Sequence, residues 1–480
     1  MMSLGSSPRS PELEEDAEVT FVVRSEQHVA VVNRRALSPD VSPVLLALVA
    51  ERDEDGAPTG EKDAQGRYVL EGPSNGHAFN LLVRCVQKGG RLTPAEVMEH
   101  LPDLEAVLEA CRYADYYLLP GQAKMQLTRH LLSSFKGAEA SGSLIDCEKL
   151  GLCRSEMIMD RIHLEGLALR GLQLEDSHVR QVLIRRCRLV DCEMAMSVTA
   201  GEVQISQSRL ENVQLGVFVT KISVEDSSEL VGCNLRVIEE LLVRDSNLQN
   251  CTFQGSDEDR KDRQVVSANF CSTEIHGDTT LPFDRIVCEQ TCFHGDVMRM
   301  TKGGATISLT KTRIISLPSI ESQSKVFLCL EDCDLVEALN FHHMKLQLRD
   351  VRISKPCEFV DVEFVEKVCD ITFPRKSRFR QVRFKDGIER CIASGCHFEG
   401  CNLGYGQDAV AACLLTHCHF QSCRFPFLEA DSPVANLSGS NFVSCRIQWS
   451  GQFPHEESFV INSYWLRKWN LAGCTVSDGN

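Results

Sequence analysis

The residues with the most evident potential for chemistry are histidines and cysteines in the second half of the chain. His417, Cys418 and His419 are consecutive and form the most metal-like tripeptide. His397 has the same sequence context as His419, because each stands between a cysteine and a phenylalanine. Two histidines at equivalent positions of a repeat could supply two ligands to a metal ion. The alternative is a pair of surface histidines without a metal.

Clustered carboxylates are a second candidate, since β-helix enzymes that cleave polysaccharides use paired acids on one outer face. Acidic pairs such as Glu225-Asp226 and Glu331-Asp332 are spread along the chain, and no cluster stands out from them. Nucleophile motifs, glycine-rich phosphate loops and Cys-x2-Cys pairs do not occur in the sequence. We therefore predict that the protein is not an enzyme and has no catalytic residue, cofactor or metal site.

A group of arginines points to binding instead. Arg378, Arg380 and Arg383 lie close together and take the polar, outward positions of the repeat described below. The chain as a whole carries a formal charge of −16, which argues against a nucleic-acid backbone binder with its basic stripe. We predict that the three arginines form a partner-binding patch for an acidic protein. A solvated face without a partner is the alternative.

The elements that position these side chains follow from a five-residue repeat. Seven consecutive pentads, from Ile162-His-Leu164 to Cys192-Glu-Met194, carry an apolar or small residue and an apolar residue two places later. A helix would repeat at 3.6 residues and a half-buried strand at two. A period of five is typical of a short strand that points two side chains inward and then turns a corner. Repetition of this motif predicts a solenoid.

The repeat continues beyond residue 194 with loops of uneven length between the pentads. An apolar position recurs about every 21 residues, which predicts the length of one coil. Its members are Leu189, Leu210, Leu230, Leu248, Phe270, Phe293, Ile314, Leu335, Phe359, Phe379, Phe398, Phe420 and Phe442. We expect the last three phenylalanines to form an inward ladder. A second ladder is expected from Cys401, Cys423 and Cys445.

The 23 cysteines fit this arrangement. Free cysteine behaves as a small buried hydrophobe, and eleven cysteines fall at the small position of a pentad, which predicts that they fill the core. These are Cys187, Cys192, Cys251, Cys333, Cys357, Cys396, Cys401, Cys418, Cys423, Cys445 and Cys474. The stretch from Met1 to Pro11 has no apolar signal core, and no run is long enough to span a membrane. We therefore expect a cytoplasmic or nuclear protein without disulfides.

The first 120 residues have a different pattern, with short strands and amphipathic helices. Strands are predicted at 19–23, 28–32 and 67–70, and helices at 44–50, 78–87 and 104–114. Four segments in this order resemble a BTB/POZ domain of the potassium-channel tetramerisation type. They are Gly66-Arg-Tyr-Val-Leu70, Ala78-Phe-Asn-Leu-Leu-Val-Arg84, Lys88-Gly-Gly-Arg-Leu92 and Val107-Leu-Glu-Ala-Cys-Arg-Tyr-Ala-Asp-Tyr-Tyr-Leu-Leu119. An unrelated small α+β domain is the alternative.

The repeats resemble pentapeptide-repeat proteins and, more broadly, right-handed parallel β-helices. Pentapeptide proteins keep four pentads in every coil, and only 162–194 obeys that rule, so a three-sided or a four-sided coil remains open. A BTB-like domain followed by such repeats resembles the pentapeptide-bearing members of the KCTD group. This resemblance implies self-association, and an adaptor that brings a client protein to a cullin-3 ubiquitin ligase.

The sequence thus predicts a mostly β protein in four segments. Residues 1–16 are a disordered lead, 17–120 a small α+β BTB-like domain, 121–155 a connecting helix and linker, and 156–480 a right-handed parallel β-helix. We expect a non-enzymatic interaction protein that self-associates and binds an unknown protein client, without a nucleic-acid or membrane partner. The alternatives are a structural scaffold with no ligase link and a β-helix carbohydrate-active enzyme. The client, the oligomer number and the functional outer face are left open.

Overall fold

The computed structural model describes most of the chain, and its contacts divide it into two compact units. The N-terminal unit comprises Met1–Gly201 and Val213–Val217, and the C-terminal unit comprises Glu202–Asn212 and Phe218–Asn480. The described residues are 17–24, 28–50, 60–134, 144–152, 158–254, 267–276, 279–280, 283, 285–294, 298–299, 305–314, 326–404, 410–429, 437, 439–450, 470–472 and 474–478. Strands make up 47% and helices 18%, so the protein is mostly β, as predicted.

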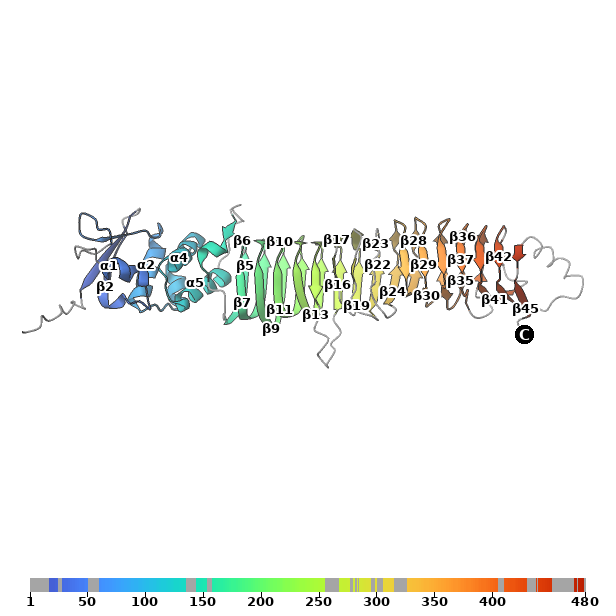
Figure 1. The fold of residues 1–480 in the computed structure, drawn as a ribbon, viewed down its shortest axis with the longest axis horizontal. Helices are drawn as coiled ribbons and strands as arrows, with labels where there is room; N and C mark the ends of the chain where they lie inside the picture. Colours follow the sequence, from blue (N-terminus) through green and yellow to red (C-terminus); the bar gives the residue numbers. More distant parts are fainter. Residues whose placement is uncertain are drawn as a thin grey trace, which may run out of the picture. The chain divides into compact units, whose positions relative to one another are not determined.

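The N-terminal unit begins with a small sheet and five helices (Figure 1). Strands β1 (Glu18–Val23), β2 (Val29–Asn33) and β3 (Tyr68–Leu70) form a sheet of order β2-β1-β3, in which β1 runs antiparallel to β2 and parallel to β3. The helices are α1 (Pro43–Ala50), α2 (Gly76–Gln87), α3 (Pro94–His100), α4 (Leu104–Tyr116) and α5 (Gly121–Ser134), and η1 (Arg34–Ala36) is a 3-10 turn. Every strand and helix predicted between residues 19 and 114 is present.

Helix α3 was not predicted from its short apolar pattern, although its start carries a clear signal. The Thr93 side chain accepts a hydrogen bond from the Glu96 amide, and the Glu96 carboxylate accepts one from the Thr93 amide. This reciprocal capping, with proline at the first helical position, stabilises a helix as short as α3. The core of the region packs apolar residues of the sheet, such as Phe21, against those of the helices, such as Phe79.

The N-terminal unit also contains the first turns of a parallel solenoid. The shorter strands are β4 (Ile145–Asp146), β6 (Ala168–Arg170) and β8 (Arg188–Val190), and the longer ones are β5 (Ile158–Glu165) and β7 (Gln173–Arg185). Strand β4 precedes the 3-10 turn η2 (Cys147–Leu150) and pairs with β6. The solenoid therefore begins inside the segment 121–155, and Leu150 joins the core formed by the helices.

Two long columns of parallel strands make up the first part of the C-terminal unit; β9 (Glu193–Ser206) and β11 (Gln214–Glu225) have residues in both units. The short-strand column contains β10 (Arg209–Glu211), β12 (Glu229–Val231), β14 (Asn247–Gln249), β17 (Glu274–His276), β20 (Cys292–His294), β23 (Arg313–Ile314), β25 (Asp334–Leu335) and β28 (Arg352–Ile353). The other contains β13 (Asn234–Arg244), β16 (Ser267–Cys271), β19 (Arg285–Glu289), β22 (Thr306–Thr310), β24 (Val326–Glu331), β27 (Met344–Arg349), β30 (Glu363–Phe364) and β34 (Arg383–Phe384), with the side branch β15 (Thr252–Gln254), β18 (Thr279–Thr280) and β21 (Met298–Arg299).

The last turns carry shorter strands on more faces. The sheet that we call the phenylalanine sheet contains β26 (Asn340–His342), β29 (Glu358–Val360), β33 (Arg378–Arg380), β37 (His397–Glu399), β40 (His419–Gln421), β42 (Asn441–Val443) and β44 (Asn470–Ala472). Three further sheets comprise β31 (Val368–Cys369), β35 (Ile388–Glu389) and β38 (Val410–Ala411); β32 (Thr372–Phe373), β36 (Ile392–Ser394) and β39 (Leu414–Thr416); and β41 (Arg424–Glu429), β43 (Arg446–Ser450) and β45 (Thr475–Asp478).

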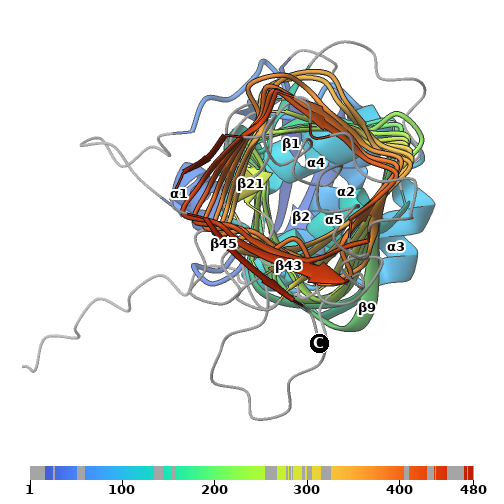
Figure 2. The ribbon, with the colours of Figure 1, turned by 90° about the vertical axis from the view of Figure 1, so that its right-hand side faces the viewer.

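The fold is a right-handed parallel β-solenoid of about 11 turns, as the repeat predicted. The turns that begin at Glu358 and Arg378 each carry four strands, one on each of four faces. These turns are therefore four-sided, which resolves for them the choice that the sequence left open. Viewed along the axis of the solenoid, the orange and red strands of the C-terminal unit lie over one another in a closed outline (Figure 2).

The corners explain the five-residue step. The residue just before the small position has a positive φ, as at Asp191 (52°) and Ser422 (55°), and this left-handed conformation turns the chain. The small residue that follows is buried and donates to nearby carbonyls. The Cys423 thiol donates to the carbonyls of Phe398 and Gln421, at 3.3 Å each. The hydroxyls of Thr291 and Ser228 likewise donate to a carbonyl of the preceding turn and to a nearby carbonyl of their own turn, so cysteine, serine and threonine share one structural role here.

This role accounts for the cysteines. Of the eleven cysteines predicted to lie in the core, ten are buried and Cys474 is half-buried. Cys233, Cys391 and Cys413 were not assigned from the sequence, yet they are also buried and follow a residue with a positive φ. All described cysteines are free thiols.

The phenylalanine ladder is longer than predicted. Rings at Phe341, Phe359, Phe379, Phe398, Phe420 and Phe442 stack on one another, with centroids 4.5 to 4.9 Å apart. In-register parallel strands stand about 4.8 Å apart, so a phenylalanine in every turn stacks without leaving its strand. These side chains are 3% exposed or less.

The predicted 21-residue series was wrong at two places. Ile275, and not Phe270, lies opposite Leu248. Ile353, and not Phe359, lies opposite Leu335, because Phe359 belongs to the phenylalanine sheet. Loops of uneven length shift the count between coils, so a fixed period assigns some residues to the wrong face.

Some predictions concern residues outside the described part of the chain. The predicted disordered lead, 1–16, and most of the linker after α5 lie there. Among the described residues, no helix combines the length and the apolar character needed to cross a bilayer.

Candidate partner-binding surface on the solenoid

The three predicted arginines lie on two neighbouring faces of the same turn. Arg378 and Arg380 are the first and last residues of β33, and Arg383 begins β34. All three are exposed, whereas Phe379 between the first two is buried. This alternation follows from the strand geometry, which sends successive side chains to opposite sides. The outward orientation predicted from the pentad pattern is therefore present.

The parallel register places a column of mostly polar side chains on either side of the phenylalanine ladder. The first column contains, in order, Asn340, Glu358, Arg378, His397, His419 and Asn441. The second contains His342, Val360, Arg380, Glu399, Gln421 and Val443. Neighbours in a column come from successive turns, so the surface brings together residues about 20 positions apart in sequence.

The arginines differ in their ion pairs. Arg380 lies between two carboxylates, with nitrogen–oxygen distances of 3.8 Å to Glu358 and 3.6 Å to Glu399. Arg383 lies 4.0 Å from the Glu363 carboxylate. Within the described residues, the Arg378 side chain has no ion pair. Its charge is therefore the least compensated of the three.

A hollow opens on the phenylalanine sheet next to Arg378. It has a volume of about 210 Å³. Its walls are Arg378, Phe379, Arg380, His397, Phe398, Glu399, His419 and Gln421. The two histidines that the sequence placed at equivalent positions meet here, with ring centroids 5.5 Å apart.

A column that is rich in arginine lies on the neighbouring face of the solenoid, around the corner from the phenylalanine sheet. Arg383, Asn402, Arg424 and Arg446 follow one another in register, because Asn402 bridges the strands on its two sides. Arg424 and Arg446 are directly opposite each other on adjacent turns. Like charges in this position destabilise a sheet. We use the name basic edge for the three arginines of this column, Arg383, Arg424 and Arg446, together with Arg380 of the adjoining phenylalanine sheet.

Asn402, Arg424 and Arg446 were not predicted as site residues, although the signal is visible in the sequence. Each directly follows a cysteine at the small position, as in Cys401-Asn, Cys423-Arg and Cys445-Arg. This pattern marks their shared pentad position, but only the strand register shows that Arg383 lies in the same column. The prediction grouped arginines that are close together in the sequence, and it therefore included only the arginines of one turn.

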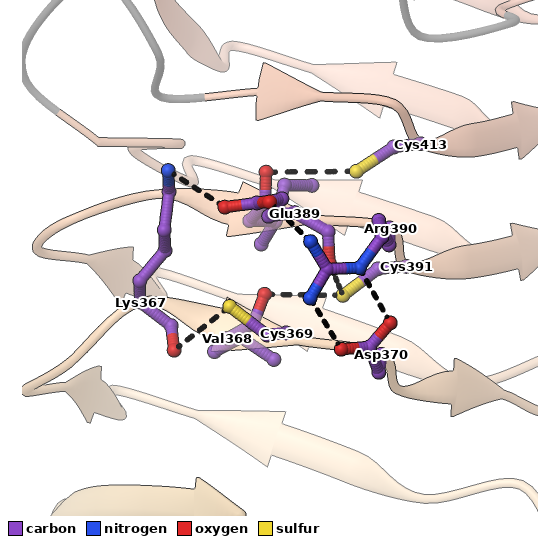
Figure 3. Close-up of polar contacts among 9 residues, drawn as sticks. Lys367, Val368, Cys369, Asp370, Glu389, Arg390, Cys391 and Cys413 are labelled. Carbon is purple, nitrogen blue, oxygen red and sulfur yellow. Dashed lines mark hydrogen bonds and ion pairs between the residues drawn. The ribbon is translucent and has the colours of Figure 1, made fainter.

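A different face of the solenoid shows an arrangement in which opposite charges meet (Figure 3). Arg390 donates to both carboxylate oxygens of Asp370, at 2.7 and 2.6 Å, and also contacts Glu389. Lys367 lies 3.0 Å from the Glu389 carboxylate. The hydrogen bonds from Arg390 lower the pKa of Asp370 below its ordinary value. We call Lys367, Asp370, Glu389 and Arg390 the matched face.

The metal-like tripeptide separates as expected from its pentad register. Cys418 is buried and its thiol donates to the Ala393 carbonyl at 3.2 Å, while His419 lines the hollow. Among the described residues, no group of three or more histidine, cysteine or acidic side chains could hold a metal ion.

Several buried cysteines are also poor nucleophiles, because the thiolate is the reactive form. Burial raises the pKa of Cys333 to about 11 and that of Cys85 to about 12. At neutral pH both groups are therefore thiols, in agreement with a structural role.

Comparison of the chain with protein-family models, with curated proteins and with solved structures gives no match in any of the three.

Proposed function

We propose that this chain is a non-enzymatic interaction protein whose solenoid binds an acidic segment of a partner protein along the basic edge. The observation that carries the proposal is the register of Arg383, Arg424 and Arg446, which stacks arginines with Asn402 in the place of a carboxylate. This arrangement costs stability in the free protein, because like charges face each other. An acidic ligand would remove that cost on binding.

A short acidic peptide fits this surface better than a nucleic acid. The formal charge of the chain is −16, so positive potential is local and a long polyanion would meet repulsion around it. Arginines in adjacent turns stand about 4.8 Å apart. A peptide lying along the edge can thus present several carboxylates to them at once. Such complementarity accelerates encounter and selects the partner.

The N-terminal region has a proposed role of its own. We propose that it self-associates as a BTB-like domain, and that the assembly acts as a client adaptor for a cullin-3 ubiquitin ligase. The support is the order of its four sequence motifs and an apolar surface on β2, where Val29 and Val31 are 47% and 43% exposed. Strand β2 is at the edge of its sheet, and unpaired edges invite pairing with another chain.

Light scattering on the full chain tests self-association, since a strict monomer at micromolar concentration would contradict it. Co-purification of the full chain with cullin 3 tests the adaptor role. If the chain forms oligomers but never retains cullin 3 beside a positive control, it is a structural scaffold without a ligase link.

Peptide binding tests the basic edge. The probe is a fluorescein-labelled dodecapeptide of alternating glutamate and glycine, and its control carries glutamine in place of glutamate. We expect fluorescence anisotropy to show binding of the acidic peptide alone, weakened by added salt. The triple variant Arg383→Ala, Arg424→Ala, Arg446→Ala should lose at least about tenfold in affinity, at about 0.5–1 kcal/mol for each exposed charge.

A matched control separates the site from net charge. Arg209, Arg349 and Arg390 are exposed arginines that each pair with a carboxylate. Their triple alanine variant has the same net charge as the basic-edge variant. We expect its affinity to change less than about twofold. Equal losses in the two variants would show that the peptide senses only the overall charge and would overturn the proposal.

A further inference from the structure

The hollow beside the basic edge contains an arginine and two histidines that are not part of the edge. Its floor is rigid, because Phe379 and Phe398 point inward and stack with centroids 4.5 Å apart and their planes within 4°. Its rim consists of polar side chains from three successive turns, β33, β37 and β40. The strands hold these side chains in register, so the rim is organised before any ligand binds.

The charges around the hollow are unevenly distributed. On one side Arg380 lies between the carboxylates of Glu358 and Glu399, at 3.8 and 3.6 Å, so these two acids share a cation. On the other side Arg378 stands between Glu358 and His397 in its column, and it has no ion pair within the described residues because the Glu358 carboxylate pairs with Arg380. The acid on the rim is thus paired, while an arginine with its hydrogen-bonding fork remains available to an anion.

His419 is arranged to act as a donor as well. Its Nδ1 lies 3.4 Å from Nδ2 of Asn441, and Oδ1 of Asn441 is buried without a partner in the described part of the chain. In this contact the Asn441 amide donates to Nδ1, so the neutral imidazole carries its proton on Nε2 and can donate it to an anion.

We propose that the hollow is a phosphate-binding subsite, which recognises a phosphorylated side chain in the acidic partner. This inference rests on the proposed function of the basic edge. A phosphate monoester carries about −1.5 to −2 charges and three terminal acceptor oxygens. Arg378 can hold two of these oxygens in a bidentate contact, and an imidazole can donate to the third. A carboxylate has two oxygens, which Arg378 alone would occupy.

The size of the hollow fits this ligand. Its 210 Å³ equals the volume of about seven water molecules, at about 30 Å³ each. This is enough for a phosphate group and the end of the side chain that carries it. Arg380 borders the hollow and also belongs to the basic edge. One peptide can therefore place its phosphate in the hollow and its carboxylates along the edge.

A protein ligand suits the rim better than a membrane or an RNA. The phenylalanines of the hollow face the core and are 0% and 3% exposed. The rim thus presents no apolar side chain to enter a bilayer, and no phenylalanine, tyrosine or tryptophan ring on which a base could stack.

Three labelled peptides of identical length test the proposal. Each is the acidic dodecapeptide with a different central residue: phosphoserine, serine or glutamate. With the full chain we expect the phosphoserine peptide to bind at least about tenfold more tightly than the serine peptide, and about fivefold more tightly than the glutamate peptide. Inorganic phosphate at millimolar concentration should reduce this difference.

Two variants assign the difference to the hollow. Arg378→Gln should reduce the preference for phosphoserine to less than about twofold while leaving the affinity for the serine peptide within about twofold. The matched control is Arg352→Gln, at an exposed arginine on β28 that lies near Asp334, and it should retain the full preference. His419→Gln should reduce the preference partially. Circular dichroism checks that each variant is folded.

The outcomes separate this inference from the proposed function. Equal binding of all three peptides to the wild-type chain overturns the phosphate subsite and leaves the basic edge intact. Absence of binding by every peptide overturns both. If Arg378→Gln weakens all peptides equally, Arg378 supplies only general charge and the subsite is refuted. Binding to vesicles containing a phosphorylated phosphatidylinositol, with no preference among the peptides, would also refute it.

Discussion

The matched face and the basic edge lie on overlapping stretches of the same solenoid, and they arrange their charges in opposite ways. On the matched face, Arg390 meets Asp370 of the preceding turn, and Lys367 meets Glu389 of the following turn. On the basic edge, Arg424 is opposite Arg446. Both faces have short strands and left-handed corners. The two rows differ in what faces the arginine one turn away, which is a carboxylate for Arg390 and another arginine for Arg424.

This contrast shows how a parallel solenoid controls its surface charge. Each outward residue stacks on its equivalent in the next turn, so alternating signs neutralise a column and repeated signs accumulate in it. Neutral columns cover most of a solvated scaffold at little cost. A column of repeated charge is costly in the free protein, and a ligand of opposite charge can compensate that cost. We infer binding from the column that departs from alternation.

The largest expected effect concerns the core that both faces share. Phe420 is 0% exposed and stacks between Phe398 and Phe442, at 4.7 and 4.9 Å. Phe420→Asp would bury an unpaired charge and leave a cavity, which we expect to cost at least about 4 kcal/mol. Thermal unfolding followed by circular dichroism should show a large loss of stability. The peptide-binding surface should be lost with it.

Gln421→Asp is the control for this change. It introduces the same side chain at the next residue, which is exposed, and should leave the melting temperature nearly unchanged. Similar melting of both variants would mean that the inward and outward positions of β40 are not distinguished as described.

A pair of charge reversals tests the comparison itself. Arg390→Glu would place a third carboxylate beside Asp370 and Glu389, so the melting temperature should fall while peptide affinity stays within about twofold. Arg446→Glu would place a carboxylate opposite Arg424, so stability should hold or rise. Its affinity for the acidic peptide should fall about fivefold or more. If both reversals affect stability and binding alike, the two faces do not differ in function.

A single substitution should make the charge pattern of the basic edge more similar to that of the matched face. Asn402→Glu would put a carboxylate in register with Arg383 on one side and Arg424 on the other. We expect a gain of a few tenths of a kcal/mol to about 1 kcal/mol in stability. The affinity for the acidic peptide should fall about three- to fivefold. Asn402→Gln keeps the size of the new side chain without its charge and should show neither change.

The pentad pattern was sufficient to predict the solenoid, because burial of two side chains per step is a local property of the sequence. It also placed Phe379 inward and its neighbouring arginines outward. It could not assign columns across turns, as Phe270 and Phe359 show, because loops of uneven length change the register without leaving a signal in the repeat. The basic edge depends on that register, so Arg424 and Arg446 became visible as partners of Arg383 only in the folded chain.

The smallest expected effect is a pH dependence of the matched face. Because Arg390 lowers the pKa of Asp370 in the folded state, the ionised carboxylate contributes stability above the ordinary aspartate pKa of about 3.9. This contribution is lost as the pH falls through the lowered pKa. Asp370→Asn should therefore reduce the melting temperature slightly at pH 7, and the difference from wild type should shrink below about pH 4.

Asp386→Asn is the control, since Asp386 is exposed, lies nearby and has no ion pair within the described residues. It changes the net charge equally and should not reproduce the pH-dependent difference. An Asp370→Asn difference that stays constant from pH 7 to pH 3 would show that charge matching does not stabilise this face. The cost assigned to arginines that face each other on adjacent turns would then lose its basis, because both faces obey the same electrostatics.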